Sequence, residues 1–376
     1  MVDLQESRKE LDKVDKEIVQ LLQKRLEIVK DVADYKKGTG KKVLDKEREK
    51  SKLETLEAMA EDEFTSQSID EIFRQIMSIG RKMQYGLIPT YDQELMCVEN
   101  LGITKDTKVM FFGEPGSYTE QAMAEVFGEE IISVKGQKFE DVMQAVANKE
   151  VDYGVLAIEN SSTGGITDNY DLFMKYDNTI VGEHVVKVEH ALLGVPGAKI
   201  EDITKVYSHP QGIYQCRAFL AEHENMVAYE YFSTSAGAKK VADDGDIKQA
   251  AIASERAAGC YGLDILAHAI NFESENCTRF IVITNERKYL KDANKVSISF
   301  ELPHEPGSLY GILSHIHFNG LNMTKIESRP ITGRNWEYRF FVDFEGNLQD
   351  AGVRNAMDGI REEAVSFRIL GNYGVL

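Results

Sequence analysis

Two basic side chains near the N-terminus have the spacing of one binding site. Arg25 occupies the missing position of an apolar stripe that otherwise runs through Leu11, Val14, Ile18, Leu21, Ile28 and Val32. Lys36 follows eleven residues later, close to three helical turns, so both cations lie on one face with roughly 16 Å between their backbones. A buried guanidinium without a partner is costly. Arg25 is therefore ion-paired, snorkelling to water, or binding a small anion together with Lys36.

Further polar residues recur in two following helical segments. Asp45, Arg48 and Glu49 share the first turn and a half of the second segment, where the helix dipole alone also favours acidic residues. Gln84 ends an apolar stripe of the third segment that runs through Ile69, Phe73, Ile76 and Gly80. Arg8 lies about 25 Å along the first helix from the stripe arginine, so it joins that site only from a second subunit. Cations and neutral donors without a nucleophile suit a reaction in which a dianion is held in a reactive shape.

Hydroxyl-rich turns follow several apolar strands in the middle of the chain, at 113–119, 159–165, 208–211 and 233–236, and residues 277–280 open the last apolar strand. Each turn alone fits an ordinary helix N-cap. In an open α/β sheet, however, ligands bind beyond the carboxyl ends of the strands, where helix N-termini offer free amides to anions. Together the turns favour a polar cleft built for a carboxylate.

Three kinds of periodicity must position these residues. Apolar residues three and four apart predict helices over 4–35, 45–60 and 69–83. From Lys108 to about Leu290, apolar runs alternate with helical stretches, which is typical of α/β architecture with a largely parallel sheet. The tail follows the order βαββαβ of a ferredoxin-like module. We therefore predict a multi-domain chain with an all-α domain at 1–88, a linker at 89–106, an α/β domain at 107–290 and an α+β domain at 294–376.

The composition is that of a folded protein with surplus negative charge. The 376 residues are 43% hydrophobic and 28% charged, with a formal charge of -18. This balance disfavours nucleic acid and anionic membrane partners, and no apolar run is long enough to span a bilayer. The four cysteines have neither disulfide nor zinc spacing, and His315 and His317 point in different directions on a helix. We expect a cytoplasmic protein with no metal and no cofactor.

The helical residues at this order and spacing resemble the all-helical chorismate mutases over about residues 4–85. The resemblance implies that Arg25, with Arg8 of a partner chain, binds the carboxylates of chorismate. Lys36 and Gln84 would donate to the ether oxygen that gains charge as the bond breaks. Glu49 and Asp45 would bind the ring hydroxyl, with Arg48 and Gly80 also at the substrate. Gly80 departs from the family pattern, which usually has serine near the ring carboxylate.

The turns in the middle of the chain are similar to those of the prephenate dehydratases over roughly residues 107–288. The resemblance implies two α/β lobes around a cleft, like a periplasmic binding protein, that converts prephenate to phenylpyruvate. Thr278 would assist departure of the ring hydroxyl, and we expect Arg279 to hold the pyruvyl carboxylate, because a cation on the departing carboxylate would stabilise the ground state. His209 is either a general acid or a structural histidine. The expected substrate-binding residues are Ser117, Glu159, Asn160, Ser208, His209, Gln211, Ser233, Thr234, Ser235 and Phe280.

The tail resembles the phenylalanine-binding ACT domains of such dehydratases. The residues that carry this resemblance are Gly307, Ser308, Leu309, Asn322, Glu327, Ser328, Arg329 and Pro330. Ser308 replaces the usual alanine of a Gly-Ala-Leu motif, and Gly307 also fits a simple turn. Because such modules pair edge to edge, an amino acid at their interface can be coupled to the catalytic cleft. We expect inhibition by L-phenylalanine.

The sequence as a whole predicts a homodimer, or a higher homo-oligomer, that makes phenylpyruvate from chorismate by way of prephenate for phenylalanine synthesis. Two alternatives stay open. One is a dehydratase that takes the aminated substrate arogenate, and the other is a non-catalytic sensor of aromatic acids.

Overall fold

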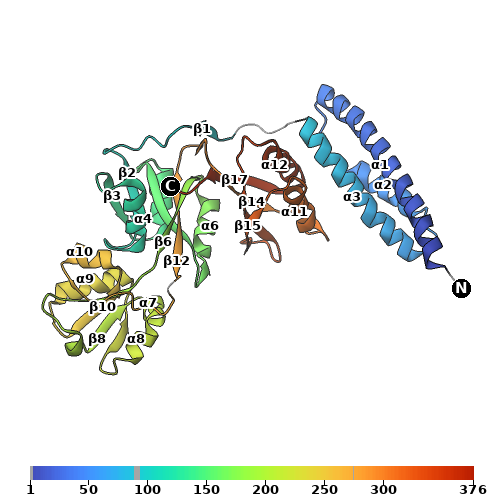
Figure 1. Cartoon of the computed structure of the whole chain (residues 1–376). Coiled ribbons are helices and arrows are strands. Elements are labelled where there is room, and N and C mark those ends of the chain that lie inside the picture. Colours follow the sequence, from blue (N-terminus) through green and yellow to red (C-terminus); the bar gives the residue numbers. More distant parts are fainter. Residues whose placement is uncertain (1–2, 89–93, 274) are drawn as a thin grey trace. The chain divides into compact units, whose positions relative to one another are not determined.

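A computed structural model describes residues 3–88, 94–273 and 275–376. The chain forms two compact units, one of Met1–Gln93 with Ile298–Arg368 and one of Glu94–Ser297 with Ile369–Leu376. Figure 1 labels their helices and strands. None of the helices within the described ranges combines the length and the hydropathy needed to cross a membrane.

The first unit begins with the three predicted helices, α1 (Leu4–Thr39), α2 (Lys46–Glu57) and α3 (Glu63–Leu87). Each starts at an aspartate whose side chain accepts a hydrogen bond from the first turn, namely Asp3, Asp45 and Asp62, as N-caps do. The cap at Asp62 starts α3 six residues before the predicted position, which the apolar pattern alone did not mark. Gly40 ends α1 in the left-handed conformation that glycine adopts most easily.

The apolar stripe of α1 is not the face that packs within the chain. Leu11, Val14, Ile18, Leu21 and Ile28 are 50–67% exposed. The buried residues of α1 are Val29 and Ala33, in the half of the helix that packs against α3. Arg25 stands within the stripe in sequence, but its guanidinium reaches the Ile76 carbonyl of α3.

The C-terminal residues have the predicted βαββαβ order. The elements are β14 (Lys295–Glu301), α11 (Ser308–Phe318), β15 (Met323–Pro330), β16 (Tyr338–Glu345), α12 (Ala351–Glu363) and β17 (Ser366–Tyr373). Their strands lie in the order β15-β16-β14-β17, so β15 is at the sheet edge. Helix α12 packs against α11 and also against α3 of the same unit.

The second unit has two α/β lobes. The first is built on the strand order β6-β12-β4-β2-β3, from β2 (Lys108–Phe112), β3 (Ile132–Gly136), β4 (Tyr153–Asn160), β6 (Thr179–Lys187) and β12 (Cys277–Thr284). A short strand, β5 (Gly164–Gly165), pairs with β4. The helices of this lobe are α4 (Tyr118–Phe127), α5 (Phe139–Ala147) and α6 (Thr167–Lys175).

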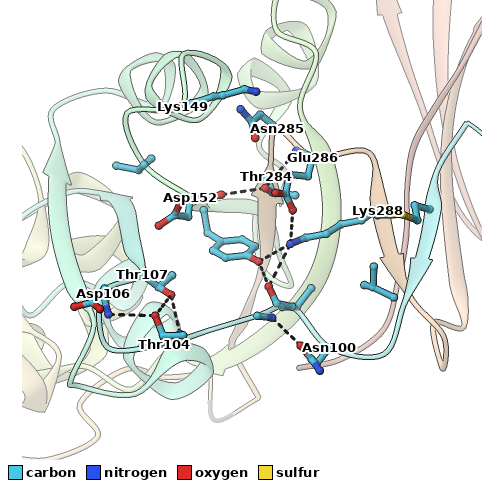
Figure 2. Close-up of a pocket in the computed structure, with 16 residues that line it drawn as sticks. Asn100, Thr104, Asp106, Thr107, Lys149, Asp152, Thr284, Asn285, Glu286 and Lys288 are labelled. Carbon is cyan, nitrogen blue, oxygen red and sulfur yellow. Dashed lines mark hydrogen bonds and ion pairs between the residues drawn. The ribbon is translucent and has the colours of Figure 1, made fainter.

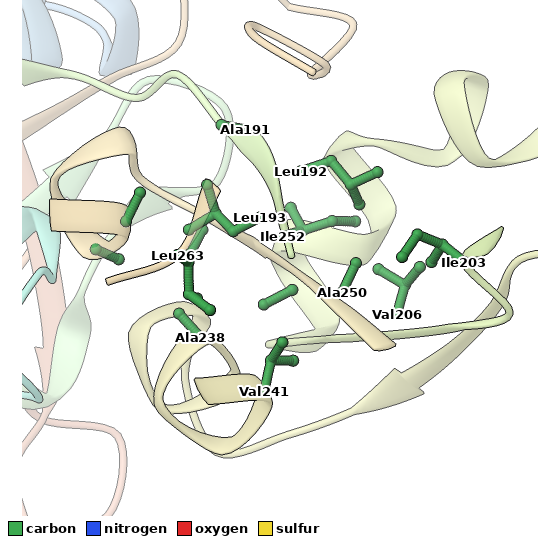
Figure 3. Close-up of a cluster of buried hydrophobic side chains, with 14 of the residues drawn as sticks. Ala191, Leu192, Leu193, Ile203, Val206, Ala238, Val241, Ala250, Ile252 and Leu263 are labelled. Carbon is green, nitrogen blue, oxygen red and sulfur yellow. The ribbon is translucent and has the colours of Figure 1, made fainter. Parts of the chain in front are cut away.

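The second lobe has the strand order β11-β7-β10-β8-β9. Its strands are β7 (Ala191–Gly194), β8 (Lys205–Ser208), β9 (Val227–Glu230), β10 (Gln249–Ala253) and β11 (Asp264–Ala267). Its helices are α7 (Pro210–Gln215), α8 (Arg217–Ala221), α9 (Thr234–Asp244) and α10 (Glu255–Tyr261), with a 3-10 turn at Ile200–Asp202. Figure 3 shows the apolar cluster between sheet and helices, in which Leu192, Ile252 and Val241 are fully buried.

Both sheets are mixed, which corrects the prediction of a largely parallel sheet. Strand β12 runs antiparallel to both β4 and β6, and β7 runs antiparallel to β10 and β11. The chain leaves the first lobe after β6 and re-enters it through β12, and these two strands run in opposite directions.

Two segments connect distant parts of the second unit. Residues 94–106, which composition assigns to a linker, contain β1 (Met96–Val98), paired in parallel with β13 (Lys288–Leu290). At the other end, Gly371 of β17 pairs with Ile180 of β6. The amide of Leu376 donates to the Glu183 carbonyl at 2.9 Å.

Candidate functional site

The half-buried Arg25 side chain lies between α1 and α3. Its Nη1 donates to the Ile76 carbonyl of α3 at 3.2 Å. Gly80, one turn further along α3, leaves room for the guanidinium, because a Cβ there would lie 3.3 Å from Nη1. Burial lowers the pKa of Arg25, and Glu49 partly opposes that shift. The arginine is thus a partly desolvated cation with a neutral partner, which favours a bound anion.

Lys36 lies three turns further along the same face of α1. Its Nζ donates to the Val43 carbonyl at 2.6 Å. Burial lowers the pKa of Lys36, while the nearby carboxylates of Glu362, Asp45 and Glu49 raise it. The positions of Arg25 and Lys36 on α1 are consistent with the prediction that both cations lie on one helix face. In the structure each of them donates to a main-chain carbonyl.

The acidic residues of α2 have different surroundings. Asp45 is the N-cap of α2 and accepts from the Arg48 amide at 3.1 Å, which is the structural role left open above. Glu49 is ion-paired with Arg81 of α3, whose Nη1 lies 2.7 and 2.5 Å from its two oxygens. Arg81 is a residue that sequence reasoning missed, since its partner lies in another helix.

The remaining residues of the first predicted site are divided between interior and surface. Gln84 is 7% exposed; its Nε2 donates to the Gly80 carbonyl at 3.2 Å. Its Oε1 is buried with no hydrogen-bond partner among the described residues. Arg8 and Arg48 are exposed, and Arg8 lies in the other half of α1.

Two of the predicted dehydratase residues, Asn160 and Thr278, meet where β4 and β12 pair. Asn160 Nδ2 lies 2.9 Å from Thr278 Oγ1 and 2.9 Å from Asn276 Oδ1. Asn160 Oδ1 accepts from the Ser162 amide at 3.0 Å, which fixes the orientation of the side chain. Because Thr278 accepts from Asn160, its own hydroxyl proton remains available for donation. Asn276 and Ser162 were missed by the sequence analysis.

Arg279 lies on the other face of the same strands. Its guanidinium is 2.9 Å from Glu159 and 3.2 Å from Glu183, and Lys295 also pairs with Glu183. Neighbouring residues in a strand point to opposite faces, so Thr278 and Arg279 face different spaces. Phe280 is 1% exposed and belongs to an apolar core cluster.

The turns of the second lobe hold mostly local hydrogen bonds. Buried Ser208 donates to the Ile252 carbonyl at 2.7 Å. His209 caps α7 and accepts from the Gln211 amide at 3.2 Å; burial lowers its pKa, with Glu230 opposing. Ser233 caps α9, which starts at Thr234. Ser235 is fully buried, and its Oγ has no hydrogen-bond partner within the described part of the chain.

The two lobes touch at Gly116, the residue before the predicted Ser117. A Cβ at Gly116 would lie 2.5 Å from the Ala257 Cα of α10. Ser254 Oγ donates to the Gly116 carbonyl at 2.6 Å, and Ser117 caps α4 by accepting from the Glu120 amide at 3.3 Å. The turn that carries Ser117 is therefore held by the opposite lobe.

A second group missed from sequence lies beside that contact. The Tyr118 hydroxyl is 3.0 Å from His190 Nδ1, and His190 Nε2 is 2.9 Å from Gln215 Oε1. Burial lowers the pKa of His190 and raises that of Tyr118 well above its usual value. Both side chains are therefore neutral near pH 7.

A cavity of about 620 Å³ lies elsewhere in the first lobe. Figure 2 shows Lys149, Asp152, Thr284 and Lys288 among its lining residues. Lys288 Nζ donates to the Tyr153 hydroxyl at 2.8 Å. Among the described residues that line the cavity, none is a predicted substrate-binding residue. The described residues also contain no cluster of three histidine, cysteine or carboxylate side chains that could bind a metal.

The predicted effector residues lie at the start of α11 and on β15. Gly307 has a φ of 80° and is the N-cap of α11, directly followed by Ser308 and Leu309. Asn322 precedes β15, which carries Glu327, Ser328, Arg329 and Pro330 and pairs with β16 on one side.

Comparisons with known proteins match two separate parts of the chain and the chain as a whole. A family model described as chorismate mutase type II matches residues 7–85, and one described as prephenate dehydratase matches residues 109–288. A bifunctional chorismate mutase/prephenate dehydratase of Aquifex aeolicus is 33% identical over 99% of this chain and 98% of its own length. An arogenate dehydratase/prephenate dehydratase of Arabidopsis thaliana is 38% identical over 72% of this chain and 73% of its own. The structure of an Arthrobacter aurescens prephenate dehydratase in complex with L-Phe covers 71% of this chain and 90% of that one, with a TM-score of 0.67 and 29% identity.

Proposed function

The chain belongs to the bifunctional chorismate mutase/prephenate dehydratases and is an enzyme with both activities; we propose that it uses them in sequence to make phenylpyruvate for phenylalanine synthesis. The proposal assigns the mutase to a domain at 1–88, the dehydratase to 107–290 and effector binding to 294–376. A cytoplasmic location, as predicted from composition, is part of the proposal.

The mutase assignment is supported by two partly desolvated cations that form no ion pair with a carboxylate in the described part of the chain. Arg25 and Lys36 both donate to main-chain carbonyls, and a dicarboxylate is a stronger acceptor for both. In the proposed site Arg25 binds one carboxylate, while Lys36 and Gln84 donate to the ether oxygen. Charge that develops on that oxygen is stabilised by donors already in place. Glu49, Asp45, Arg48 and Gly80 complete the substrate contacts.

The exposed stripe of α1 supports a second copy as the source of Arg8. Five apolar side chains there are at least half exposed, and an apolar seam at this spacing pairs helices. Two antiparallel copies of α1 would bring Arg8 of each chain toward Arg25 of the other. We propose a homodimer, or a higher homo-oligomer, on this ground.

The dehydratase assignment depends most on the Thr278–Asn160 contact. A threonine hydroxyl that accepts from an amide donates its own proton outward, which suits protonation or hydrogen bonding of a departing ring hydroxyl. Arg279 is kept as the proposed partner of the pyruvyl carboxylate. Because its guanidinium lies on the strand face opposite Thr278 and pairs with Glu159 and Glu183, one prephenate molecule contacts both residues only if Arg279 leaves these partners and turns toward the Thr278 face. The turns with Ser117, Ser208, His209, Gln211, Ser233, Thr234 and Ser235 supply further polar contacts, and Phe280 supports the site from the core.

The C-terminal module is proposed to bind L-phenylalanine and inhibit the enzyme. The βαββαβ order and the edge position of β15 support pairing of two modules, with Gly307, Ser308 and Leu309 opposite Asn322 and the residues of β15. A prephenate dehydratase of similar fold was solved with L-Phe bound.

A coupled assay on chorismate tests the proposal. We expect Lys36→Ala to lower the mutase kcat at least tenfold and to leave conversion of added prephenate unchanged, and Thr278→Ala to do the reverse. Wild-type turnover in either variant removes that residue from the mechanism. Offering arogenate beside prephenate decides between the two dehydratase substrates, and added phenylalanine should lower the rate. Purified protein that converts neither chorismate, prephenate nor arogenate would point to an aromatic-acid sensor.

A further inference from the structure

The last turn of α12 carries two adjacent carboxylates that contact the mutase helices. Glu363 Oε1 accepts from Arg81 Nε at 2.9 Å. Glu362 Oε2 accepts from the Tyr85 hydroxyl at 2.6 Å and from the Leu44 amide at 3.0 Å. Both carboxylates belong to the C-terminal module. Their partners Arg81, Tyr85 and Leu44 belong to the helical segment that carries the proposed mutase site.

The Glu363 contact leads to Glu49 through one guanidinium. Arg81 uses Nε for Glu363 and Nη1 for both oxygens of Glu49. The side chains of Arg81 and Glu363 are only 12% and 14% exposed, so water cannot readily replace either partner. Burial alone would raise the pKa of Glu363, but His315 and Arg81 hold it below its usual value, so the carboxylate is charged near pH 7. The position of the Glu49 carboxylate therefore depends on a charge in α12.

The Glu362 contact leads to Lys36 and Asp45 through three consecutive residues. Glu362 holds the Leu44 amide, the preceding Val43 carbonyl accepts from Lys36 Nζ at 2.6 Å, and the following Asp45 caps α2. A single carboxylate thus holds the turn that orients a proposed donor and starts the helix of Glu49.

We propose that Glu362 and Glu363 are positioning residues of the chorismate mutase site, so that α12 of the C-terminal module completes a site otherwise built from α1, α2 and α3. The inference rests on the mutase site assigned above. It implies that any change in the module that moves α12 is transmitted to the mutase as well as to the dehydratase.

The interface offers a matched control that only fastens the same helices. Lys82 Nζ of α3 donates to Ser314 Oγ of α11 at 2.9 Å, and among the described residues neither side chain forms a hydrogen bond or ion pair with Glu49, Lys36 or Gln84. Ser314→Ala therefore weakens the docking of the module on α3 without touching Glu49 or Lys36. A purely structural role for the carboxylates predicts the same outcome for all three variants.

The experiment measures mutase and dehydratase kinetics of the full chain for Glu362→Gln, Glu363→Gln, Ser314→Ala and Lys36→Ala. We expect each glutamine variant to lower the mutase kcat/KM about tenfold, the loss of one charged hydrogen bond, with prephenate turnover unchanged. Glu363→Gln should act mainly on KM, through Glu49. Ser314→Ala should stay within twofold of wild type in both reactions.

A pH profile adds a readout that simple packing does not move. The charged groups that face Lys36 are Glu362 of α12 and Asp45, Arg48 and Glu49 of the second helix and its cap. Lys36 is a cationic, and therefore stronger, donor only while protonated, and the Glu362 charge favours that form. Glu362→Gln should therefore move the alkaline decline of mutase kcat to lower pH, and Glu363→Gln should leave the decline in place.

The outcomes separate this inference from the proposed function. Loss of mutase activity in Lys36→Ala but wild-type kinetics in both glutamine variants would overturn the role of α12 alone. A wild-type Lys36→Ala would overturn the site itself. Equal losses in Ser314→Ala, or loss of both reactions together with the thermal midpoint in every variant, would reduce the carboxylates to docking contacts. Arg81→Lys, which keeps the charge but makes fewer bonds, should show an intermediate loss of mutase activity alone.

Discussion

Replacing Gly116 by alanine tests whether the dehydratase depends on the close contact between its lobes. Gly116 has a φ of +78°, and its added Cβ would lie 2.5 Å from Ala257 Cα and 2.8 Å from Ala257 Cβ. Carbon atoms rest at about 3.5–4.0 Å. The two lobes must therefore separate by about 1 Å, or the turn must refold.

The free-energy cost expected for Gly116→Ala has two parts of similar size. The left-handed backbone conformation costs about 1–2 kcal/mol for a residue with a Cβ. Separation also strains the buried hydrogen bond from Ser254 to the Gly116 carbonyl, and a buried polar group left unpaired costs about 1–3 kcal/mol. A displacement of 1 Å at a catalytic site lowers turnover by about 10²-fold. We expect a loss of this order in dehydratase kcat/KM, because Ser117 follows directly.

Gly262 provides a matched control for the backbone part. It ends α10, the helix that carries Ala257, in the left-handed conformation with a φ of 65° and a ψ of 37°, and no atom lies within 4 Å of its added Cβ. Gly262→Ala should lose only about 1–2 kcal/mol of stability and keep dehydratase turnover. The assay follows phenylpyruvate formation from prephenate, with chorismate consumption and the thermal midpoint as internal references. Wild-type dehydratase kinetics in Gly116→Ala would refute the reasoning, as would equal losses in both variants.

Three further substitutions test other contacts. Gly80→Ser places a hydroxyl beside Arg25, whose Nη1 would lie 3.3 Å from the new Cβ. We expect the KM for chorismate to fall about fivefold, the effect of one hydrogen bond, while kcat stays within twofold. A raised KM would mean that displacement of Arg25 dominates. Gly359→Ala overlaps the fully buried His315 ring and should cost about 1–3 kcal/mol as overpacking, seen as a lower thermal midpoint; an unchanged midpoint would show that α11 and α12 can separate freely. Glu363 has a pKa held below its unfolded value of 4.5. The stability that its charge contributes is therefore complete above that pH and is lost as the pH falls through the folded pKa. The urea midpoints of wild type and Glu363→Gln should converge on acidification, and a constant difference down to pH 3 would contradict this.

Local sequence pattern predicted the elements better than the contacts between them. Helical spacing alone placed Arg25 and Lys36 on one face, because one helix fixes both. It did not predict that the apolar stripe of α1 stays exposed, since that depends on which face α3 covers. Strand β1 was hidden in an apparent linker because β13, its partner, lies about two hundred residues away in the sequence.

The same limit applies to the candidate sites. The hydroxyl-rich segments of the sequence include Asn160 and Thr278, and these two residues are hydrogen-bonded in the structure. The sequence could indicate them because hydroxyl and amide residues at strand ends mark the edge of a sheet where ligands bind. The opposite faces of Thr278 and Arg279 follow from strand geometry, and the ion-pair partners of Arg279, Glu159 and Glu183, lie on the neighbouring strands β4 and β6. Arg81 stands in an ordinary helical pattern, and only the fold shows that it joins Glu49 to Glu363.

The course of β17 affects how deletion experiments are to be interpreted. Its first residues, up to Arg368, belong to the module unit, but Ile369–Leu376 belong to the dehydratase unit, where Gly371 pairs with β6 and the Leu376 side chain covers Gly182. A shortened chain without the C-terminal module would also remove a neighbour of β6. Slow turnover in such a truncation would then report a damaged sheet, so the proposed phenylalanine response is better tested by point changes that leave residues 369–376 in place.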